Sequence, residues 1–291
     1  MADEYTRRIG DRAEGRQLRT LSAYGRLVPY LIKSRGEAEV FFPDKVEVTE
    51  IDRYIREKHE QGYTSLSMQH IFLAAYVRTV SHIPGLNRFI SGSRIYARHT
   101  IDAVLTVSRM LPDSSQDTSV KLSLTPEDTI YDILRKLDAT ADALRSGSSS
   151  NALEQFAAPM IKMPSPIIKF CVWFLNLADF FGLLPRPLLA VSPFHGSVSV
   201  SDFDGIPPIH RGLYSIGNIP LHMSIGGVHR EVELDEFGTP VLNRYVDYSL
   251  AIDERICVEF ETVEALKYFK YYLRNPKLLE TSPEHIADEI F

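Results

Sequence analysis

The sequence predicts an α/β fold in a single domain. Stretches typical of β-strands alternate along the 291 residues with stretches typical of amphipathic helices, and a hydrophobic content of 44% suits one large globular domain. The most informative stretch is C-terminal: an apolar strand at 242–252, the charged turn Asp253-Glu254-Arg255, and an amphipathic helix at about 262–273. Charged residues at the end of a buried strand are costly to keep, so this turn is the first candidate for a site.

Composition excludes several classes of protein. A net charge of −6 argues against nucleic acid as a partner. Cys171 and Cys257 are too few and too far apart for a zinc site or a disulfide framework, and no histidine spacing typical of a metal site occurs. The N-terminus is polar and Arg-rich, without the apolar core of a signal peptide. We therefore expect a cytoplasmic protein without a bound metal ion.

Helices and strands are expected to alternate through the N-terminal half. Residues 1–35 are predicted to form an N-terminal helical arm with a helix at about 18–33, and the main domain then runs over 36–280. A strand at 39–49 leads into a helix capped by Thr49 that ends near Gln61. A second helix at 67–83 is stopped by Pro84-Gly85. Short strands follow at 88–90, 94–96, 102–109 and 119–124, and Thr125 is expected to cap a helix that runs to about residue 145.

The C-terminal half is expected to carry a helical insertion at about 150–190, after a flexible joint at 146–150. Strands are expected at 196–202, 221–226 and 245–252, with a hairpin turn at 234–239. The apolar segment 166–184 nears the length of a membrane span but contains Lys169, Asn176 and Asp179. A buried or oligomer-facing helix is the favoured interpretation. A mobile substrate lid and a helix on a membrane surface remain as alternatives.

The C-terminal stretch resembles the catalytic domain of the 2-oxoacid dehydrogenase dihydrolipoyl acyltransferases, of which chloramphenicol acetyltransferase is a structural cousin. The family pattern is Asp-His-Arg-x-x-Asp-Gly, followed by a helix that ends near Asn/Asp-Pro. Here Asp253, Arg255 and Asn275-Pro276 match, whereas Glu254, Val258 and Glu259 replace the His, the Asp and the Gly. Residues 84–87 and 196–203 resemble two further family segments. The resemblance covers about 40–145 and 190–279, and the absence of a preceding lipoyl segment suggests a stand-alone member.

The resemblance implies a chloramphenicol-acetyltransferase-like two-layer α/β sandwich, with a mixed β-sheet and helices on one face. It also implies a reaction. In the family, the His removes a proton from a thiol of coenzyme A or dihydrolipoamide, and a Ser or Thr of a neighbouring subunit stabilises the oxyanion. Carried over by position, Glu254 would stand in the base position and Ser201 would donate the hydroxyl, with Asp253 and Arg255 as structural residues. Coenzyme A thioesters would be substrates, and no covalently bound cofactor is expected.

A carboxylate is a weak base toward a thiol. Reference pKa values of about 4.3 and 8.5 make the proton transfer cost roughly 5–6 kcal/mol, which burial of the acid would reduce. Two functions therefore stay open: acyl transfer from acyl-CoA or another thioester to a small acceptor, or a catalytically inactive scaffold in which Asp253-Glu254-Arg255 is an ion-paired turn. A base moved to His195 or His210, near Ser201, is a further alternative. Cys257 is expected to be a buried strand residue.

Assembly is also implied by the resemblance. Family members form trimers, and some trimers build cages through an apolar C-terminal anchor that docks into an adjacent trimer. We therefore expect a homotrimer, with a higher-order cage as an extension. The tail 281–291 ends in Ile290 and Phe291 after acidic residues, which makes this pair the candidate anchor. A frayed tail is the alternative.

Overall fold

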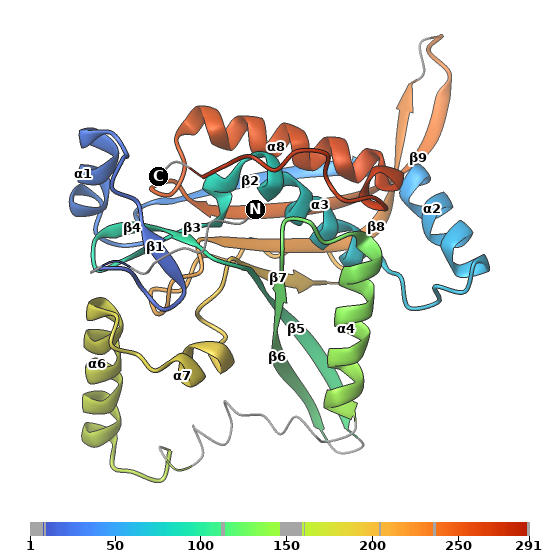
Figure 1. The fold of residues 1–291 in the computed structure, drawn as a ribbon. Helices are drawn as coiled ribbons and strands as arrows, with labels where there is room; N and C mark the ends of the chain where they lie inside the picture. The colour runs from blue at the N-terminus through green and yellow to red at the C-terminus, as the bar shows by residue number, and fades with distance from the viewer. Residues whose placement is uncertain are drawn as a thin grey trace.

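The computed structural model describes residues 8, 10–111, 114–145, 159, 161–203, 205–234 and 237–289. A six-stranded sheet forms its centre, in the order β2-β9-β8-β7-β5-β6 (Figure 1). The short β7 pairs in parallel with β5 on one side and with β8 on the other, and the remaining pairs are antiparallel, so the sheet is mixed. Its strands are β2 (Glu39–Glu47), β5 (Ile101–Leu111), β6 (Ser114–Leu124), β7 (Val198–Asp202), β8 (Leu221–Leu234) and β9 (Pro240–Asp253).

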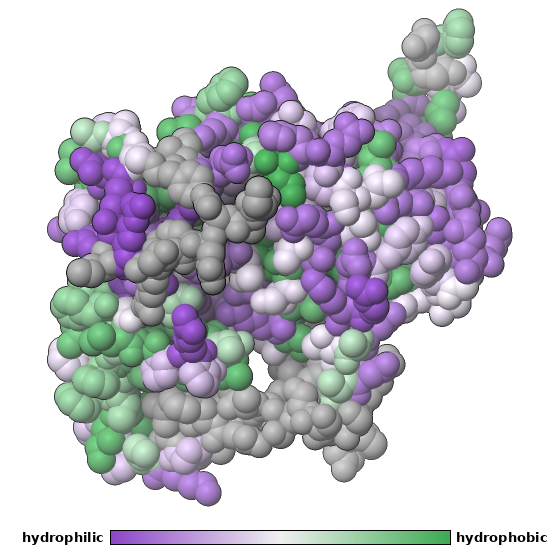
Figure 2. All heavy atoms as spheres, in the orientation of Figure 1, coloured by the Kyte–Doolittle hydropathy of each residue, from purple (hydrophilic) through white to green (hydrophobic). Residues whose placement is uncertain are grey.

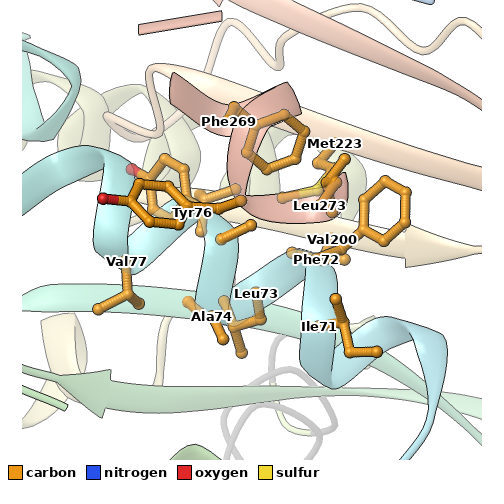
Figure 3. Packing of buried hydrophobic residues seen from close by; sticks show 14 of the residues in the cluster. Ile71, Phe72, Leu73, Ala74, Tyr76, Val77, Val200, Met223, Phe269 and Leu273 are labelled. Atoms are coloured by element: carbon orange, nitrogen blue, oxygen red, sulfur yellow. The ribbon is translucent and has the colours of Figure 1, made fainter. Parts of the chain in front are cut away.

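Four helices share one hydrophobic core with one face of this sheet. They are α2 (Thr49–Glu60), α3 (Met68–His82), α4 (Ile130–Arg145) and α8 (Glu259–Arg274). Helix α3 is buried nearly all round, and its residues meet Val200 and Met223 of the sheet and Phe269 and Leu273 of α8 (Figure 3). The Phe72 ring lies edge-on to Phe269 and to Tyr248 of β9, with centroids 5.9 and 5.5 Å apart. The predicted two layers, with helices on one face, are therefore present.

A second, three-stranded sheet flanks the core in the order β1-β4-β3. It consists of β1 (Gly15–Gln17), β4 (Arg94–Arg98) and β3 (Arg88–Ser91), and helix α1 (Ala23–Leu31) follows β1. The expected helix at 18–33 was thus too long. Leu18 continues the strand pairing by donating its N–H to the Ile95 carbonyl, and Ser22 caps α1 by accepting from the Gly25 N–H. The described residues also include three short helices: η1 (Pro84–Asn87), α7 (Arg186–Val191) and η2 (Pro276–Leu279).

Two predicted helix starts were displaced. Thr49 is the first residue of α2 rather than its cap, and its hydroxyl donates to Glu47 instead of accepting from the helix. Helix α4 begins at Ile130, because 125–128 form a turn in which the Asp128 carboxylate accepts from the Thr125 N–H. The Thr129 hydroxyl then accepts from the Asp132 N–H, the role expected of Thr125. The predicted joint at 146–150 lies outside the described residues.

The apolar segment forms helix α6 (Ser165–Phe181), and none of its residues is buried in the protomer. A helix buried within the protomer is therefore excluded, whereas the oligomer-facing helix stays a prediction. In Figure 2 its hydrophobic side chains colour one corner of the surface. The helix is held by its C-terminal end, where the Arg12 guanidinium donates to the carbonyls of Asp179 (2.7 Å) and Phe180 (2.5 Å). Gly182 ends it with φ +70°, and a Cβ there would overlap Arg12. Among the described residues, no helix combines the length and apolarity needed to cross a membrane.

Candidate functional site

The charged turn closes the buried end of β9, and its charges are internally paired. Asp253 accepts from Arg255 through both carboxylate oxygens, at 2.8 Å from Nε and 2.7 Å from Nη2. The two side chains are 1% and 3% exposed. The strand ends here, so 254–257 form a turn and Glu259 is the first residue of α8. The ion-paired turn itself is present.

The same turn holds the N-terminal segment of the chain. Arg255 donates through Nη1 to the Ile32 carbonyl just after α1 (2.9 Å), and the Glu254 N–H donates to the Ala38 carbonyl (2.9 Å). Arg35 lies nearby. Burial lowers its pKa to about 10, and Asp253 acts in the opposite direction by favouring the charged guanidinium. Asp253 is thus the counter-charge for more than one arginine.

Glu254 points away from this pair. Its side chain is exposed, and it lies on the wall of a groove with a volume of about 580 Å³. The groove runs between α1, β2, the turn and the first turns of α8. Most of its lining is apolar and includes Tyr24, Val28, Phe42, Ile252 and Val263. The candidate carboxylate therefore faces an open, largely apolar groove of a size that suits a small-molecule site.

A buried arginine, Arg88, closes the groove beside Cys257. Its guanidinium donates to the Ile256 carbonyl of the turn (3.1 Å) and to both carboxylate oxygens of Glu289 (2.7–3.1 Å). The sequence analysis missed Arg88 and Glu289, which lie 201 positions apart and share no local motif. The tail thus returns to its own protomer as far as residue 289, whereas Ile290 and Phe291, the candidate anchor, lie outside the described residues.

Cys257 is buried, as expected, but it lies in the turn and not in a strand. Burial, reinforced by the Glu261 carboxylate 3.2 Å from Sγ, raises the pKa of its thiol to about 12. A thiol in this state is a poor nucleophile, because the thiolate is the reactive form. Cys257 therefore contributes packing to the groove rather than chemistry.

Ser201 lies on the face of the sheet opposite the four core helices, and it is 5% exposed. It pairs with Ser224 of β8, which pairs with Ser249 of β9. Glu254 is five residues beyond Ser249. Strand spacing and rise place Ser201 and Glu254 about 10 Å apart across the sheet and about 17 Å apart along it. Within one protomer the structure does not bring the two candidate catalytic residues together.

Two histidines accompany these serines. His210 Nδ1 lies 2.7 Å from Ser249 Oγ, and His222 Nε2 lies 3.2 Å from Ser224 Oγ. The sequence predicted His210 as an alternative base near Ser201, and the hydroxyl that it contacts is that of Ser249. The three serines come from three strands, and only the pairing register of these strands places them side by side. No spacing in the sequence therefore predicts this cluster.

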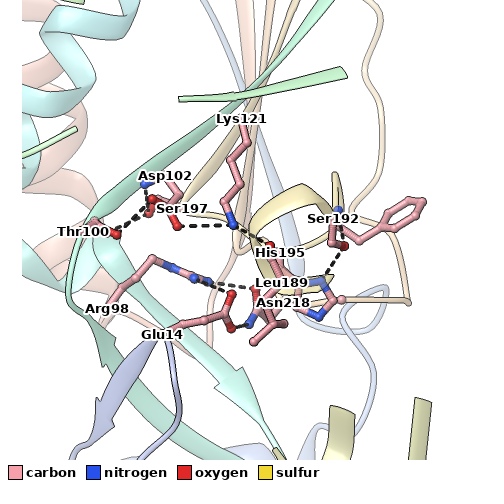
Figure 4. A network of polar contacts seen from close by, with 12 residues as sticks. Glu14, Arg98, Thr100, Asp102, Lys121, Leu189, Ser192, His195, Ser197 and Asn218 are labelled. Atoms are coloured by element: carbon pink, nitrogen blue, oxygen red, sulfur yellow. Dashed lines mark hydrogen bonds and ion pairs between the residues drawn. The ribbon is translucent and has the colours of Figure 1, made fainter. Parts of the chain in front are cut away.

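His195, the other alternative base, belongs to a polar network beside α7 (Figure 4). Its Nδ1 lies 2.7 Å from Ser192 Oγ, and its Nε2 lies 3.4 Å from Asp179. In the same network, Lys121 pairs with Asp102 at 3.4 Å, and Asn218 bridges Arg98 and Glu14. Ser192 and Asp179 thus orient the His195 ring, which has a structural role. Among the described residues, no group of three or more His, Cys, Asp or Glu side chains is placed to hold a metal ion.

The burial of His222 predicts a measurable pH dependence of stability. Desolvation, with Arg211 acting in the same direction, lowers its pKa from 6.5 to about 4. The unfolded chain therefore binds more protons than the folded one between about pH 4 and 6.5, so this histidine's contribution is complete above pH 6.5 and is lost as the pH falls toward 4. It amounts to about 3 kcal/mol at most.

Urea unfolding of His222→Gln at pH 5 and pH 7 checks this prediction. Other histidines with lowered pKa values, including His70 and His82, also make stability depend on pH. The variant should therefore show a smaller pH dependence of stability than the wild type, rather than none. As a control, the variant and the wild type should show the same dependence between pH 7 and pH 8, where His222 is neutral in the folded and the unfolded chain. An equal dependence in His222→Gln and the wild type would contradict the assignment.

No protein-family model matches the chain, and no curated protein matches its sequence. Solved structures do match. A probable dihydrolipoamide acetyltransferase from Listeria monocytogenes 4b F2365 superposes with a TM-score of 0.53 at 14% identity, over 88% of this chain and 93% of that one. The cubic core of the pyruvate dehydrogenase multienzyme complex gives 0.56 at 10% identity, over 94% of each chain. A chloramphenicol acetyltransferase gives 0.50 at 12% identity, over 86% of this chain and 94% of that one. The predicted fold class is confirmed, and at such low identity the likeness concerns the fold.

Proposed function

We propose that this protein is an acyltransferase that moves an acyl group from acyl-CoA, or another thioester, to a small acceptor in the groove beside Glu254. The observation that carries the proposal is the exposed Glu254 carboxylate on the wall of that groove. It follows a buried strand and stands at the position that the family pattern gives to its base. The acceptor and the acyl chain are not specified by the fold.

The step that Glu254 would assist is a proton transfer. As an acceptor thiol attacks the thioester carbonyl carbon, its proton passes to the Glu254 carboxylate, and the bond between that carbon and the sulfur of coenzyme A then breaks. The departing thiolate takes this proton back from Glu254, so that atoms and charges balance. A thiol is the acceptor that a carboxylate can best deprotonate, because an alcohol would widen the pKa mismatch further.

Ser201 enters this mechanism only through a second copy of the chain. Its distance from Glu254 within one protomer means that a hydroxyl for the oxyanion would have to come from a neighbouring subunit, as in the homotrimer that the family resemblance implies. Coenzyme A would be a substrate on this proposal, not a resident cofactor.

A catalytically inactive scaffold is the second candidate function. The burial of Ser201 at 5% exposure favours it, because the hydroxyl proposed for catalysis is already covered within its own protomer. A trimer or cage without turnover would then account for the retained fold. The measurement below separates the two candidates, because a scaffold has no need of an open groove.

Filling the groove should weaken acyl-CoA binding. Val263 lies on its wall at 44% exposure, so Val263→Trp adds bulk there without disturbing the core. We expect at least a tenfold rise in the Kd for acyl-CoA by isothermal calorimetry, with a matching loss of transfer to a dithiol acceptor. Val232→Trp, at 68% exposure on the β8–β9 hairpin, should bind as the wild type does. Absence of binding to the wild type, or unchanged binding in Val263→Trp, would contradict the proposal.

A further inference from the structure

Two helices expose large apolar side chains along one edge of the molecule. In Figure 1, α1 and α6 lie on the same side of the fold, and both line one hollow, through Pro29 and Lys33 on one side and Asn176 and Phe180 on the other. Helix α1 exposes Tyr24, Leu27, Tyr30 and Leu31 at 49–73%. Helix α6 exposes Ile167, Phe170, Trp173, Phe174, Leu177, Phe180 and Phe181 at 39–63%. We call these two sets together the aromatic edge.

Helix α6 has three distinct sides. Ile168, Cys171, Leu175 and Ala178 are half-buried and face the protein. The large side chains of the aromatic edge recur at i, i+3, i+4 and i+7 and so form one outward face. Lys169 and Asn176 fall between these two faces, about 100° from the centre of the apolar one, as 100° per residue predicts. A helix with an outward apolar face bordered by a cationic side is typical of one that lies in the plane of a membrane surface.

The outward position of α6 is built into the fold. Besides Arg12, the Ser91 hydroxyl donates to the Asp179 carbonyl (3.3 Å), and Gly92 allows the β3–β4 turn to approach the Phe180 carbonyl, where a Cβ would lie 2.6 Å from the oxygen. These contacts fix the end of the helix and leave its apolar face uncovered. Each large side chain so exposed forgoes part of the free energy of burial, which favours a surface that covers these side chains when the protein functions.

The charge of the edge distinguishes its partner. Residues 23–33 and 161–186 contain five cations, Arg26, Lys33, Lys162, Lys169 and Arg186, and one acid, Asp179. That acid faces inward to His195 at 3.4 Å. The rest of the chain carries the acidity that gives a net charge of −6. A second copy would bring the same cations against these in a symmetric contact, whereas anionic headgroups complement them.

We propose that the aromatic edge docks on an anionic lipid surface, with α6 and α1 lying in the plane of the interface. The aromatic and aliphatic side chains enter the boundary between headgroups and acyl chains, and the five cations pair with lipid phosphates. The docking does not depend on acyl transfer. It accounts for an apolar helix whose C-terminal end is held by Arg12 and Ser91 and which lacks the length needed to span a bilayer.

Trp173 is the only tryptophan of the chain and is 57% exposed on the docking face, so it reports binding directly. On titration with phosphatidylcholine vesicles that contain phosphatidylglycerol, its emission should shift to the blue and should be quenched by lipids brominated in the acyl chains. Pure phosphatidylcholine should give at least a tenfold weaker response, and added salt should weaken binding to the anionic vesicles. Co-sedimentation with the same vesicles gives an independent measure.

The variant Phe170→Glu, Phe174→Glu should lose at least tenfold in affinity for anionic vesicles, and Lys169→Glu should lose their preference over neutral ones. Because all three positions are exposed, circular dichroism should show an unchanged fold. The matched control is Phe237→Glu, 91% exposed near the β8–β9 turn, which should bind as the wild type does. No Trp173 shift with anionic vesicles would overturn the proposal. A second outcome would also overturn it: the wild type does not bind vesicles, and light scattering gives a lower mass for Phe170→Glu, Phe174→Glu than for the wild type. That result would mean that the aromatic edge contacts a second copy of the chain.

Discussion

Replacing Glu254 with histidine is expected to raise the rate of acyl transfer from acyl-CoA to a thiol about 100-fold. A positioned base with a pKa near the working pH contributes 10²–10⁴-fold, and histidine has a reference pKa of about 6.5 against about 4.3 for glutamate. Position 254 is exposed on the groove wall, so an imidazole fits without repacking. The Asp253–Arg255 pair, which lies behind it, stays intact. Release of free thiol from acyl-CoA, followed in the presence and absence of acceptor, measures the rate.

The control for Glu254→His is Glu254→Gln, which has a similar shape and no basic group. It should abolish whatever transfer the wild type shows and should leave acyl-CoA binding within about threefold, because the carboxylate acts on the proton and not on the acyl chain. Activity in Glu254→His should also rise with pH through about 6.5, as its imidazole loses its proton. Equal rates in the wild type and both variants, with acyl-CoA bound, would remove the base role and favour the scaffold function.

The fold could be predicted because its determinants are local or sequential. The apolar strand that ends at Asp253, the helix that follows, and the stop at Pro84-Gly85 each have a pattern within about fifteen residues. Their order carries the resemblance to the acyltransferase family, and that resemblance implied the sandwich. The two displaced helix starts show the limit of this reasoning. Thr49 and Thr125 both carry a side chain suited to a cap. The Thr49 hydroxyl donates to Glu47 instead, and the Thr125 N–H donates to Asp128 in a turn that precedes the helix.

The candidate site was predictable only in part. The sequence pointed to Glu254 and to its charged neighbours, but Arg88 and Glu289 meet across 201 positions, and nothing near either residue indicates the other. For α6 the sequence left a buried helix open beside oligomer-facing, lid and membrane-surface helices. An apolar run of that length is typical of a buried helix, and whether the chain has room to cover it depends on the tertiary fold.

Replacing Asp253 with asparagine is expected to cost about 3–5 kcal/mol of the free energy of unfolding, the range typical when one partner of a buried ion pair is removed. The carboxylate is 1% exposed and accepts two hydrogen bonds from Arg255. It also favours the charged form of Arg35, whose pKa burial lowers to about 10. Without it, two guanidinium groups would lie in a water-poor site with no full counter-charge. Urea unfolding at pH 7 measures the loss as a lower midpoint at unchanged slope.

A double-mutant cycle separates the interaction energy of the ion pair from the cost of leaving one buried charge without its partner. Arg255→Met removes the cation and fills much of the same volume with an apolar chain, so Asp253→Asn, Arg255→Met should lose about 1–3 kcal/mol less than the two single losses added together. The turn would then be held by packing and by the Glu254 N–H bond to Ala38. A loss below about 1 kcal/mol for Asp253→Asn alone would mean that water reaches Arg255. In that case the turn is an open surface feature, and Glu254 would no longer stand on a rigid support, on which its role in the groove depends.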